Sequence, residues 1–228
     1  MVVGDGLVAS AFAEFRDDDE YVIFASGVSN SQETEASEYQ REFDLLKSHL
    51  RSDACLVYFS TASIADQSRA HSHYIQHKID IEAFIAEQAS DYVIFRLPIV
   101  VGRSRNPHTL TNYLHNAIKE GNPINVYTKA IRYLIDIDDI GTLLPRFLKE
   151  KFVRNAVVNV AFDNGIAVPE LIGHFEEVIG VKANATLKEV GTRFEIDNQY
   201  FLDFLAAINF QLPEDYLLEV IRKYYGNN

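Results

Sequence analysis

Apolar runs alternate with amphipathic stretches through the first half of the chain. Four runs rich in β-branched and aromatic residues have the composition of buried strands. They cover residues 1–3, 21–27, 54–61 and 91–102. Between them, residues 33–50 and 74–88 have the spacing of helices with one apolar face, which in the first includes Phe43, Leu46 and Leu50. This alternation predicts β-α-β units and a parallel sheet with helices on both faces, which is an α/β fold.

The pattern changes after residue 102. Helical stretches there alternate with short strand runs instead of long buried ones. The helical stretches cover residues 109–121, 138–150, 167–180 and 213–225. We therefore expect one domain at 1–102 and a small C-terminal α/β lobe at 103–228, interleaved with the first in one compact unit.

Composition limits the class of protein. The 228 residues are 47% hydrophobic and 24% charged with a mean hydropathy of −0.09, which is typical of a soluble globular protein. The formal net charge of −12 argues against nonspecific nucleic-acid binding, which needs a basic surface. Because no apolar run approaches about 18 residues and the start lacks a basic signal-peptide region, we expect a cytoplasmic protein without membrane contact. The single cysteine, Cys55, should be buried and unable to form an intrachain disulfide.

Two basic islands could hold an anionic ligand locally despite the acidic total. They are residues 103–108 and 128–132. The alternative for each is an ordinary solvated loop. We expect no metal ion at the site.

A glycine pattern stands between the first strand run and the first helical stretch. In the order G-x-G-x-x-A, Gly4 turns the chain, Gly6 lets backbone approach a pyrophosphate, and Ala9 allows close helix packing. This position is the one that phosphate binding requires. The alternative is a tight turn that binds nothing.

Tyr74 and Lys78 lie one helical turn apart on the same face. An ammonium beside a phenol favours the phenolate, so we expect Lys78 to lower the pKa of Tyr74 toward neutral pH. Tyr74 would then be a general acid or base, with the Thr61 hydroxyl on the same substrate oxygen. Because strand ends in a parallel sheet face one crevice, these groups should lie near the glycine turn. The alternative is a solvent-facing pair on a helix.

These motifs, in this order, resemble the extended short-chain dehydrogenase/reductase family, the NAD(P)-dependent epimerases, dehydratases and reductases of nucleotide sugars. The resemblance covers nearly the whole chain. The matching segments are VVGDGLVA, VIFASGVSNS, VYFSTAS, HYIQHK (as Y-x-x-x-K), FRLPIVVG, IRYLIDIDDIG and VVNVAFDNGIAVPELIGHFEEVIG. The resemblance implies a truncated Rossmann-like cofactor-binding domain at 1–102 and a substrate-binding lobe at 103–228.

The resemblance also implies roles for individual residues. Tyr74 would be the acid/base, Lys78 would hold the nicotinamide ribose, and Thr61 would hydrogen-bond the reacting oxygen. NAD or NADP would contact Gly4, Asp5, Gly6, Leu7, Val8, Ala25, Ser26, Gly27, Ser60, Lys78 and Leu97. The nucleotide sugar would contact Ser63, Arg132 and Arg103. Family members often dimerise through the helices after the second and third of these strands, so a homodimer is a further expectation.

Three departures from the family pattern leave the function open. About 11 residues separate Ala9 from the strand at Tyr21, too few for two further β-α units, so the ribose-binding acid has no secure counterpart. Thr61 and Tyr74 are only 13 positions apart, which reshapes the sugar pocket. Ala62 and Ser63 replace the acidic pair of the dehydratases, so epimerisation or reduction is favoured over dehydration. The alternative is a degenerate, non-catalytic member that serves as a nucleotide- or sugar-binding or regulatory module with weak or no cofactor binding.

Overall fold

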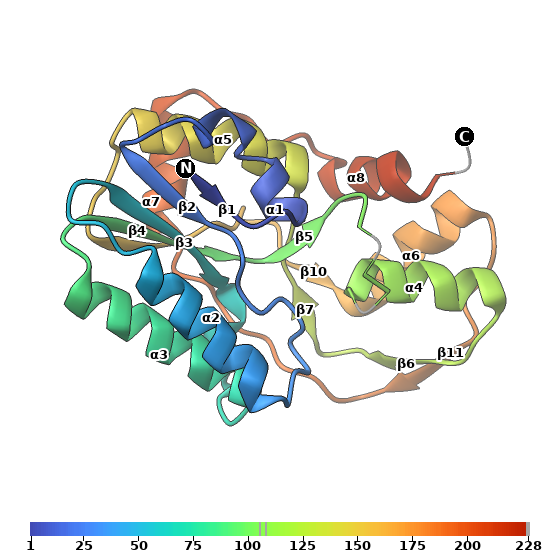
Figure 1. Cartoon of the computed structure of the whole chain (residues 1–228). Coiled ribbons are helices and arrows are strands. Elements are labelled where there is room, and N and C mark those ends of the chain that lie inside the picture. Colours follow the sequence, from blue (N-terminus) through green and yellow to red (C-terminus); the bar gives the residue numbers. More distant parts are fainter. Residues whose placement is uncertain (105, 108, 227–228) are drawn as a thin grey trace.

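A five-stranded parallel sheet forms the centre of the protein (Figure 1). The computed structural model describes residues 1–104, 106–107 and 109–226. In spatial order the strands are β1 (Val2–Val3), β2 (Tyr21–Phe24), β3 (Cys55–Thr61), β4 (Tyr92–Leu97) and β9 (Ala156–Asn159). The prediction of a parallel α/β sheet is confirmed.

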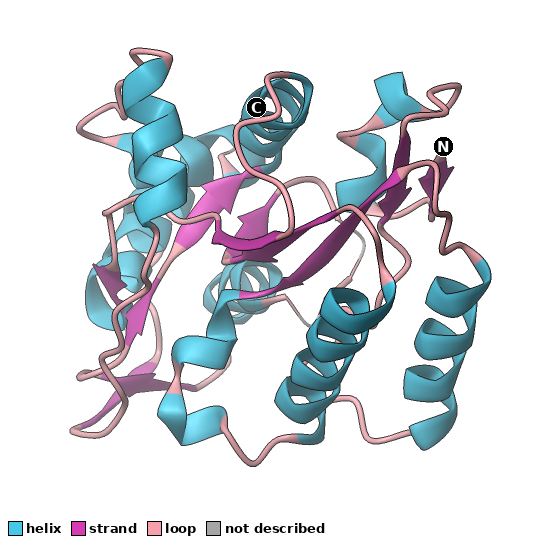
Figure 2. Cartoon of the chain, turned by 90° about the vertical axis from the view of Figure 1, so that its left-hand side faces the viewer, coloured by secondary structure: helices cyan, strands magenta, loops and turns pink. Residues whose placement is uncertain are grey.

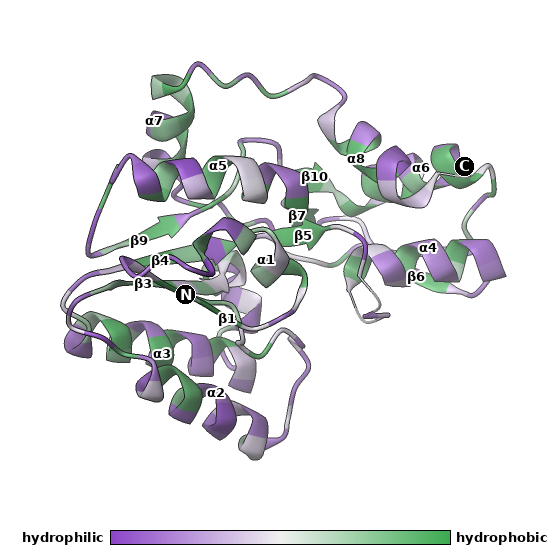
Figure 3. Ribbon diagram, turned by 45° about the horizontal axis from the view of Figure 1, so that its top comes forward, coloured by the Kyte–Doolittle hydropathy of each residue, from purple (hydrophilic) through white to green (hydrophobic). Residues whose placement is uncertain are grey.

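Helices cover both faces of this sheet (Figure 2). Because side chains alternate along a strand, Val22 and Phe24 face one layer while Ile23 faces the other. The first layer contains α2 (Ala36–Ser48) and α3 (His73–Gln88), and the second contains α1 (Leu7–Ser10), α5 (Ile137–Lys149) and α7 (Gln199–Ala207). Figure 3 shows the hydrophilic and hydrophobic sides of α2 and α3. The Ser72 hydroxyl caps α3 by accepting a hydrogen bond from the Ile75 amide at 3.2 Å.

The sheet ends at β1, which pairs with β2 and has no strand on its other side within the described residues. Between β1 and β2 the chain forms only α1 and a short 3-10 helix, η1 (Ala13–Phe15). Phe12 and Phe15 bury their rings in the core, so this segment is packed although it is short. The Rossmann half is therefore truncated, as the spacing predicted.

The later part of the chain builds a lobe beside the sheet. It contains three two-stranded sheets, in which β5 pairs with β8, β7 with β10, and β6 with β11. The strands are β5 (Ile99–Val101), β6 (Ile124–Tyr127), β7 (Ile131–Arg132), β8 (Leu134–Asp136), β10 (Ile166–Ala167) and β11 (Ala185–Lys188). The helices are α4 (Leu110–Glu120), α6 (Val168–Ile179) and α8 (Tyr216–Tyr225). None of the described helices combines the length and the apolar character that crossing a bilayer requires.

Two details differ from the expected elements. The run 91–102 is two strands in different sheets: β4 pairs with β3 and β9, β5 pairs with β8, and Pro98, which has no N–H to donate, lies between them. β9, α5 and α7 come from the second part of the chain but complete the first sheet and its cover. The division at residue 102 stays a prediction about folding units, since the apolar core is continuous across it.

Candidate active site

The carboxyl ends of β1, β2 and β3 lie side by side, because these strands are neighbours in one parallel sheet. Gly4 has a φ of 117°, and a Cβ there would lie 2.6 Å from the Ala25 carbonyl oxygen. The glycine turn thus contacts the segment that follows β2, and only glycine fits. A Cβ on Gly6 would meet nothing within 4 Å, so that face of the turn is open. The turn can therefore be approached closely by a ligand.

Tyr74 and Thr61 are brought together at the end of β3. Tyr74 is 8% exposed and packs with Val28, Ile75, Tyr39 and Ile64. The Thr61 side chain is near enough to the Tyr74 phenol to lower its pKa. The Thr61 Oγ1 also accepts a hydrogen bond from the Ser63 amide at 3.1 Å. Two hydroxyl groups thus lie near each other at the carboxyl edge of the sheet. The alternative of a solvent-facing Tyr74–Lys78 pair does not apply, because both side chains are buried.

The pKa of Tyr74 moves in the direction opposite to the expected one. Burial, followed by the negative charge of Glu42, raises the pKa of Tyr74 to about 12, and the Thr61 side chain lowers it only in part. The prediction that Lys78 lowers this pKa is wrong, because the charge of Lys78 is neutralised by another residue. The phenol is accordingly protonated at neutral pH.

Lys78 directs its ammonium into the protein interior. Its Nζ lies 2.9 Å from Glu42 Oε1 and 2.8 Å from the Tyr58 hydroxyl, and the side chain is 2% exposed. The Nζ is 5.8 Å from the centre of the Tyr74 ring. A Cβ on Gly27 would lie 2.9 Å from this Nζ, so the backbone after β2 covers the ion pair. The structure therefore does not bring Lys78 to the crevice with Tyr74 and Thr61.

Sequence reasoning missed Glu42, although the pattern held a signal. Glu42 lies four residues before Leu46, on the same stripe of α2 that buries Leu46. A charged residue within an apolar stripe requires a buried partner of opposite charge. Lys78 is that partner, but its place on another helix could not be read from α2 alone.

Two arginines lie near the site, Arg132 in β7 of the lobe and Arg69 in the loop between β3 and α3. Arg132 donates a hydrogen bond to the Ile131 carbonyl at 2.8 Å, and Arg69 donates one to the Ser31 carbonyl at 3.3 Å. Neither has a carboxylate within 4.0 Å among the residues that the structure describes. Burial lowers the pKa of Arg132, Asp66 opposes this effect, and the like charge of Arg69 adds to it. The two guanidinium groups are thus close enough to repel each other, and sequence analysis missed Arg69.

Asp66, the acid nearest to this pair, is already engaged. Its Oδ1 accepts hydrogen bonds from the Ser68 amide at 3.1 Å, the Ser68 hydroxyl at 2.6 Å and the Thr192 hydroxyl at 2.9 Å. Thr192 belongs to the segment that connects β11 to α7, so the lobe holds the loop after β3 in place. These donors are neutral, so Asp66 keeps its negative charge and offsets part of the positive charge of Arg132.

The other residues expected at the site have these positions. Asp5 is exposed in the glycine turn, Leu7 and Val8 are in α1, and Ser26 accepts hydrogen bonds from Arg41. Ser60 and Leu97 are buried near the ends of β3 and β4, and the Ser60 hydroxyl has no hydrogen-bond partner within the described structure. Arg103 is exposed after β5, whereas Arg105 and His108 of the same basic island lie outside the described residues. Their roles stay predictions.

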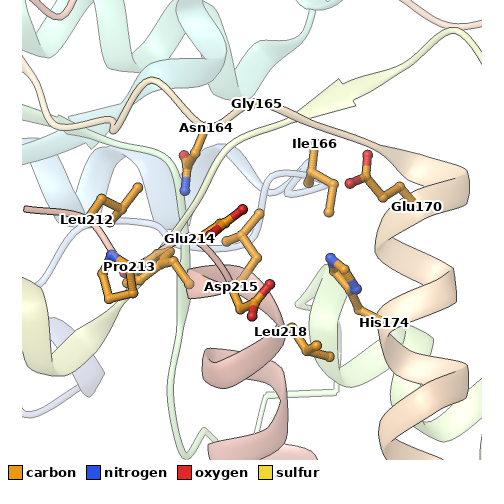
Figure 4. A pocket seen from close by; sticks show the side chains of 12 residues that line it. Asn164, Gly165, Ile166, Glu170, His174, Leu212, Pro213, Glu214, Asp215 and Leu218 are labelled. Carbon is orange, nitrogen blue, oxygen red and sulfur yellow. The ribbon is translucent and has the colours of Figure 1, made fainter.

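A separate cavity of about 260 Å³ lies in the lobe (Figure 4). Its lining comes from the loop before β10, the start of α6, and the start of α8, and includes Asn164, Glu170, His174 and Asp215. Both α6 and α8 lie far from α3 (Figures 1 and 3). This cavity is therefore distinct from the Tyr74 site. In the part of the chain that is described, no three His, Cys, Asp or Glu side chains are grouped to hold a metal ion.

Comparisons with known proteins identify the fold. The chain is similar to UDP-glucose 4-epimerase of Thermus thermophilus in complex with NAD, with a TM-score of 0.69 and 16% identity over 97% of this chain and 82% of that one. It is also similar to UDP-glucuronic acid 4-epimerase of Bacillus cereus in complex with UDP-glucuronic acid and NAD, with a TM-score of 0.69 and 15% identity over 97% of this chain and 77% of that one. A third similar structure is RMD of Pseudomonas aeruginosa complexed with NADPH, with a TM-score of 0.65 and 14% identity over 96% of this chain and 84% of that one. No family model and no curated protein matches the sequence.

The chain thus has the Rossmann-like fold of the NAD-dependent nucleotide-sugar epimerases, dehydratases and reductases. The fold expected from the resemblance is confirmed. It is shortened, because the sheet ends at β1.

Proposed function

We propose that this protein is an NAD(P)-dependent oxidoreductase that reduces a nucleotide-linked keto sugar. The observation that carries the proposal is that Tyr74 and Thr61 are neighbours at the carboxyl edge of the sheet, at the end of the strand next to the segment that the glycine turn contacts. Similar structures bind NAD, NADPH and UDP-glucuronic acid.

In a reduction, Tyr74 would be the proton donor. A phenol with a pKa of about 12 is protonated at neutral pH and can donate a proton to a carbonyl oxygen. The first step of an epimerase would need the phenolate as a base. Thr61 would donate a hydrogen bond to the same oxygen and orient it against Tyr74.

The residues present fit part of a dinucleotide. The open face at Gly6 and the left-handed turn at Gly4 fit its phosphates, and Tyr74 with Thr61 fits the nicotinamide end. When bound, NAD(P)H supplies a hydride to the sugar carbonyl carbon. The side of β1 where adenosine would lie has no strand in the described structure, so this half of the ligand has few contacts.

Arg69 and Arg132 would bind the diphosphate of the sugar nucleotide. Guanidinium groups bind phosphate oxygens through two parallel N–H bonds, and these two have no carboxylate within 4.0 Å in the described part of the chain. Arg69 is also near enough to Tyr74 for its charge to act on the phenol. A bound diphosphate would thus lie within reach of the reacting sugar.

The test combines binding and turnover. NADPH or NADH oxidation with a nucleotide-linked 4-keto sugar is measured for the native protein and for Tyr74→Phe. The substitution should lower kcat by about 100-fold or more, because it removes the proton donor and leaves the ring in place. Tyr39→Phe is the matched control, since Tyr39 is in the same cluster but its hydroxyl binds the Glu33 carbonyl. Equal turnover of Tyr74→Phe and the native protein would exclude this mechanism.

A second candidate is a non-catalytic module that binds a nucleotide sugar. It is favoured by the buried ion pair of Lys78 with Glu42 and by the sheet that ends at β1. This candidate predicts that calorimetry detects UDP binding while no NADH or NADPH binding is found at millimolar concentration. The homodimer through α2 and α3 also stays a prediction, which analytical ultracentrifugation would test.

A further inference from the structure

Asp66 joins the loop after β3 to the lobe. It caps a short 3-10 helix that ends at Arg69, and it is buried, with 4% of its surface exposed. The Thr192 hydroxyl donates a hydrogen bond to Asp66 Oδ1 at 2.9 Å, and the Thr192 carbonyl accepts one from the Ile131 amide at 3.2 Å. Arg132 follows Ile131 in β7. Two hydrogen bonds therefore connect the loop that carries Arg69 to the strand that carries Arg132.

Close packing supports this connection. Gly191, directly before Thr192, has a φ of 119°, and a Cβ there would lie 2.7 Å from the Ala130 backbone nitrogen. Only glycine fits this position, because a side chain would meet the backbone that leads into β7. The Ser68 hydroxyl also lies 3.2 Å from the Thr192 hydroxyl. The loop after β3 and the strand β7 are thus held at a fixed separation.

The hydrogen bonds to Asp66 do not require its charge. Their donors are the Ser68 amide, the Ser68 hydroxyl and the Thr192 hydroxyl, which are all neutral. Asparagine caps a helix about as well as aspartate, because its side-chain oxygen accepts the same bond. Among the residues that the structure describes, no cation lies within 4.0 Å of the Asp66 carboxylate. A buried charge without a close partner is costly, so the charge needs an explanation other than the cap.

The charge of Asp66 acts on Arg132. Burial has the largest effect on the pKa of Arg132 and lowers it; Asp66 then raises this pKa, and Arg69 lowers it. The site therefore contains two positive charges and one negative charge that influence one another. An anion bound by the two arginines is attracted by both guanidinium groups and repelled by the carboxylate. The advantage of each further negative charge on the anion is reduced accordingly.

We infer that Asp66 is a positioning and specificity-determining residue of the phosphate site: it holds Arg69 and Arg132 together, and its charge shifts the preference toward a diphosphate esterified at both ends. This inference rests on the proposed function, in which the two arginines bind the diphosphate of a nucleotide-linked sugar. A free nucleoside diphosphate carries roughly one more negative charge at pH 7, because the second pKa of a terminal phosphate is about 6. Asp66 therefore reduces competition by the free nucleotide.

Isothermal titration calorimetry measures the dissociation constants of UDP and UDP-glucose for the native protein and three variants. Asp66→Asn keeps a cap oxygen but removes the charge, so both ligands should bind more tightly and UDP should gain more. We expect the ratio of the UDP constant to the UDP-glucose constant to fall at least about threefold, the size of a screened interaction between two unit charges. Glu189→Gln is the control for charge alone, because Glu189 is exposed in the same connecting segment as Thr192. It should leave the ratio unchanged.

Thr192→Val tests the positioning role separately. It removes the hydrogen bond to Asp66 but keeps the carboxylate and both arginines. Both ligands should bind about threefold or more weakly, the effect of one net hydrogen bond, and the ratio of their constants should not change. Affinities equal to those of the native protein would overturn the positioning role.

The outcomes separate this inference from the proposed function. A ratio that does not fall in Asp66→Asn, or that falls equally in Glu189→Gln, overturns the inference, as does a native protein that binds neither ligand. If Asp66→Asn does not fold, Asp66→Ser takes its place, because serine also caps a helix without a charge. A lowered ratio, with no oxidation of NADH or NADPH by the native protein, would support the inference and exclude the proposed reduction. Turnover with an unchanged ratio would do the reverse.

Discussion

The positive charges on the two sides of Tyr74 differ in whether a carboxylate pairs with them. On the interior side, Lys78 is buried and paired with Glu42. On the side of the lobe, Arg69 and Arg132 have no carboxylate within 4.0 Å among the described residues. Burying a charge costs several kcal/mol unless a partner compensates it, so the interior cation had to be paired. Cations that are partly solvated can stay unpaired and bind a mobile anion.

This difference teaches that sequence spacing alone does not assign a lysine to a site. Tyr74 and Lys78 share one face of α3, yet the phenol meets Thr61 and the ammonium meets Glu42. The residue that decides is on α2, 36 positions away from Lys78. The following predictions test the comparison, from the largest expected effect to the smallest.

Lys78→Met should have the largest effect on stability. It would leave the Glu42 charge buried without its cation, and we expect the free energy of unfolding to fall by about 3–5 kcal/mol. Urea unfolding at pH 7 measures this change. Adding Glu42→Gln should restore most of the loss, whereas a loss under about 1 kcal/mol for the single variant would mean that the pair is solvated.

Acid should first weaken the interior side of Tyr74, where Glu42 is paired with Lys78. The folded pKa of Glu42 is lowered from 4.5 to about 2, so its contribution to stability is complete above pH 4.5 and is lost as the pH falls to about 2. The shift corresponds to about 3 kcal/mol. Unfolding curves measured across this window should show a steeper loss for the native protein than for Glu42→Gln. Parallel curves for the two proteins would contradict the assignment.

Arg69→Met and Arg132→Met should act on binding and leave the fold intact. Each removes a charge-assisted contact to phosphate, so we expect the affinity for UDP to fall by roughly tenfold. Isothermal titration calorimetry measures the affinity. The unfolding midpoint should change little, because neither arginine forms an ion pair with the residues that the structure describes. Lys129→Met, in the same basic island as Arg132, is a control for the loss of one charge. An equal effect of all three changes would indicate nonspecific attraction.

Glu38→Gln should have the smallest effect. Glu38 forms an exposed ion pair with Arg41 on α2, one turn before Glu42. Exposed pairs of this kind contribute about 0.5 kcal/mol or less because solvent screens them. Urea unfolding should therefore barely distinguish this variant from the native protein. A loss comparable to that of Lys78→Met would show that α2 itself, and not the buried pair, controls stability.

Much of the fold could be predicted because it rests on local patterns. The strands up to β4 and the helices α2 and α3 followed from apolar periodicity, and the short connection to Tyr21 predicted the truncated sheet. β11 and α7 were not predicted. β11 is exposed along its whole length, so no buried pattern indicated it. α7 buries Phe201, Phe204 and Leu205, and this spacing is a helical pattern that is present in the sequence.

The candidate site could be predicted only in part. The glycine turn follows β1, Thr61 ends β3, and Tyr74 lies in the first turn of the helix after β3, so strand order brought them to one edge. Arg69 was missed because it lies in the short loop between Thr61 and Tyr74, where no motif marks it. The pKa of Tyr74 was predicted in the wrong direction because it depends on burial and on Glu42.

The sequence by itself determined the parallel sheet, its early end at β1, and the meeting of Tyr74 with Thr61. These features follow from periodicity, chain length and strand order, which are properties of neighbouring residues. Only the tertiary structure decided which charges are paired. The pairing depends on which side chains lie together in the buried interior. An unpaired charge in the interior costs several kcal/mol, whereas an unpaired charge in solvent costs little.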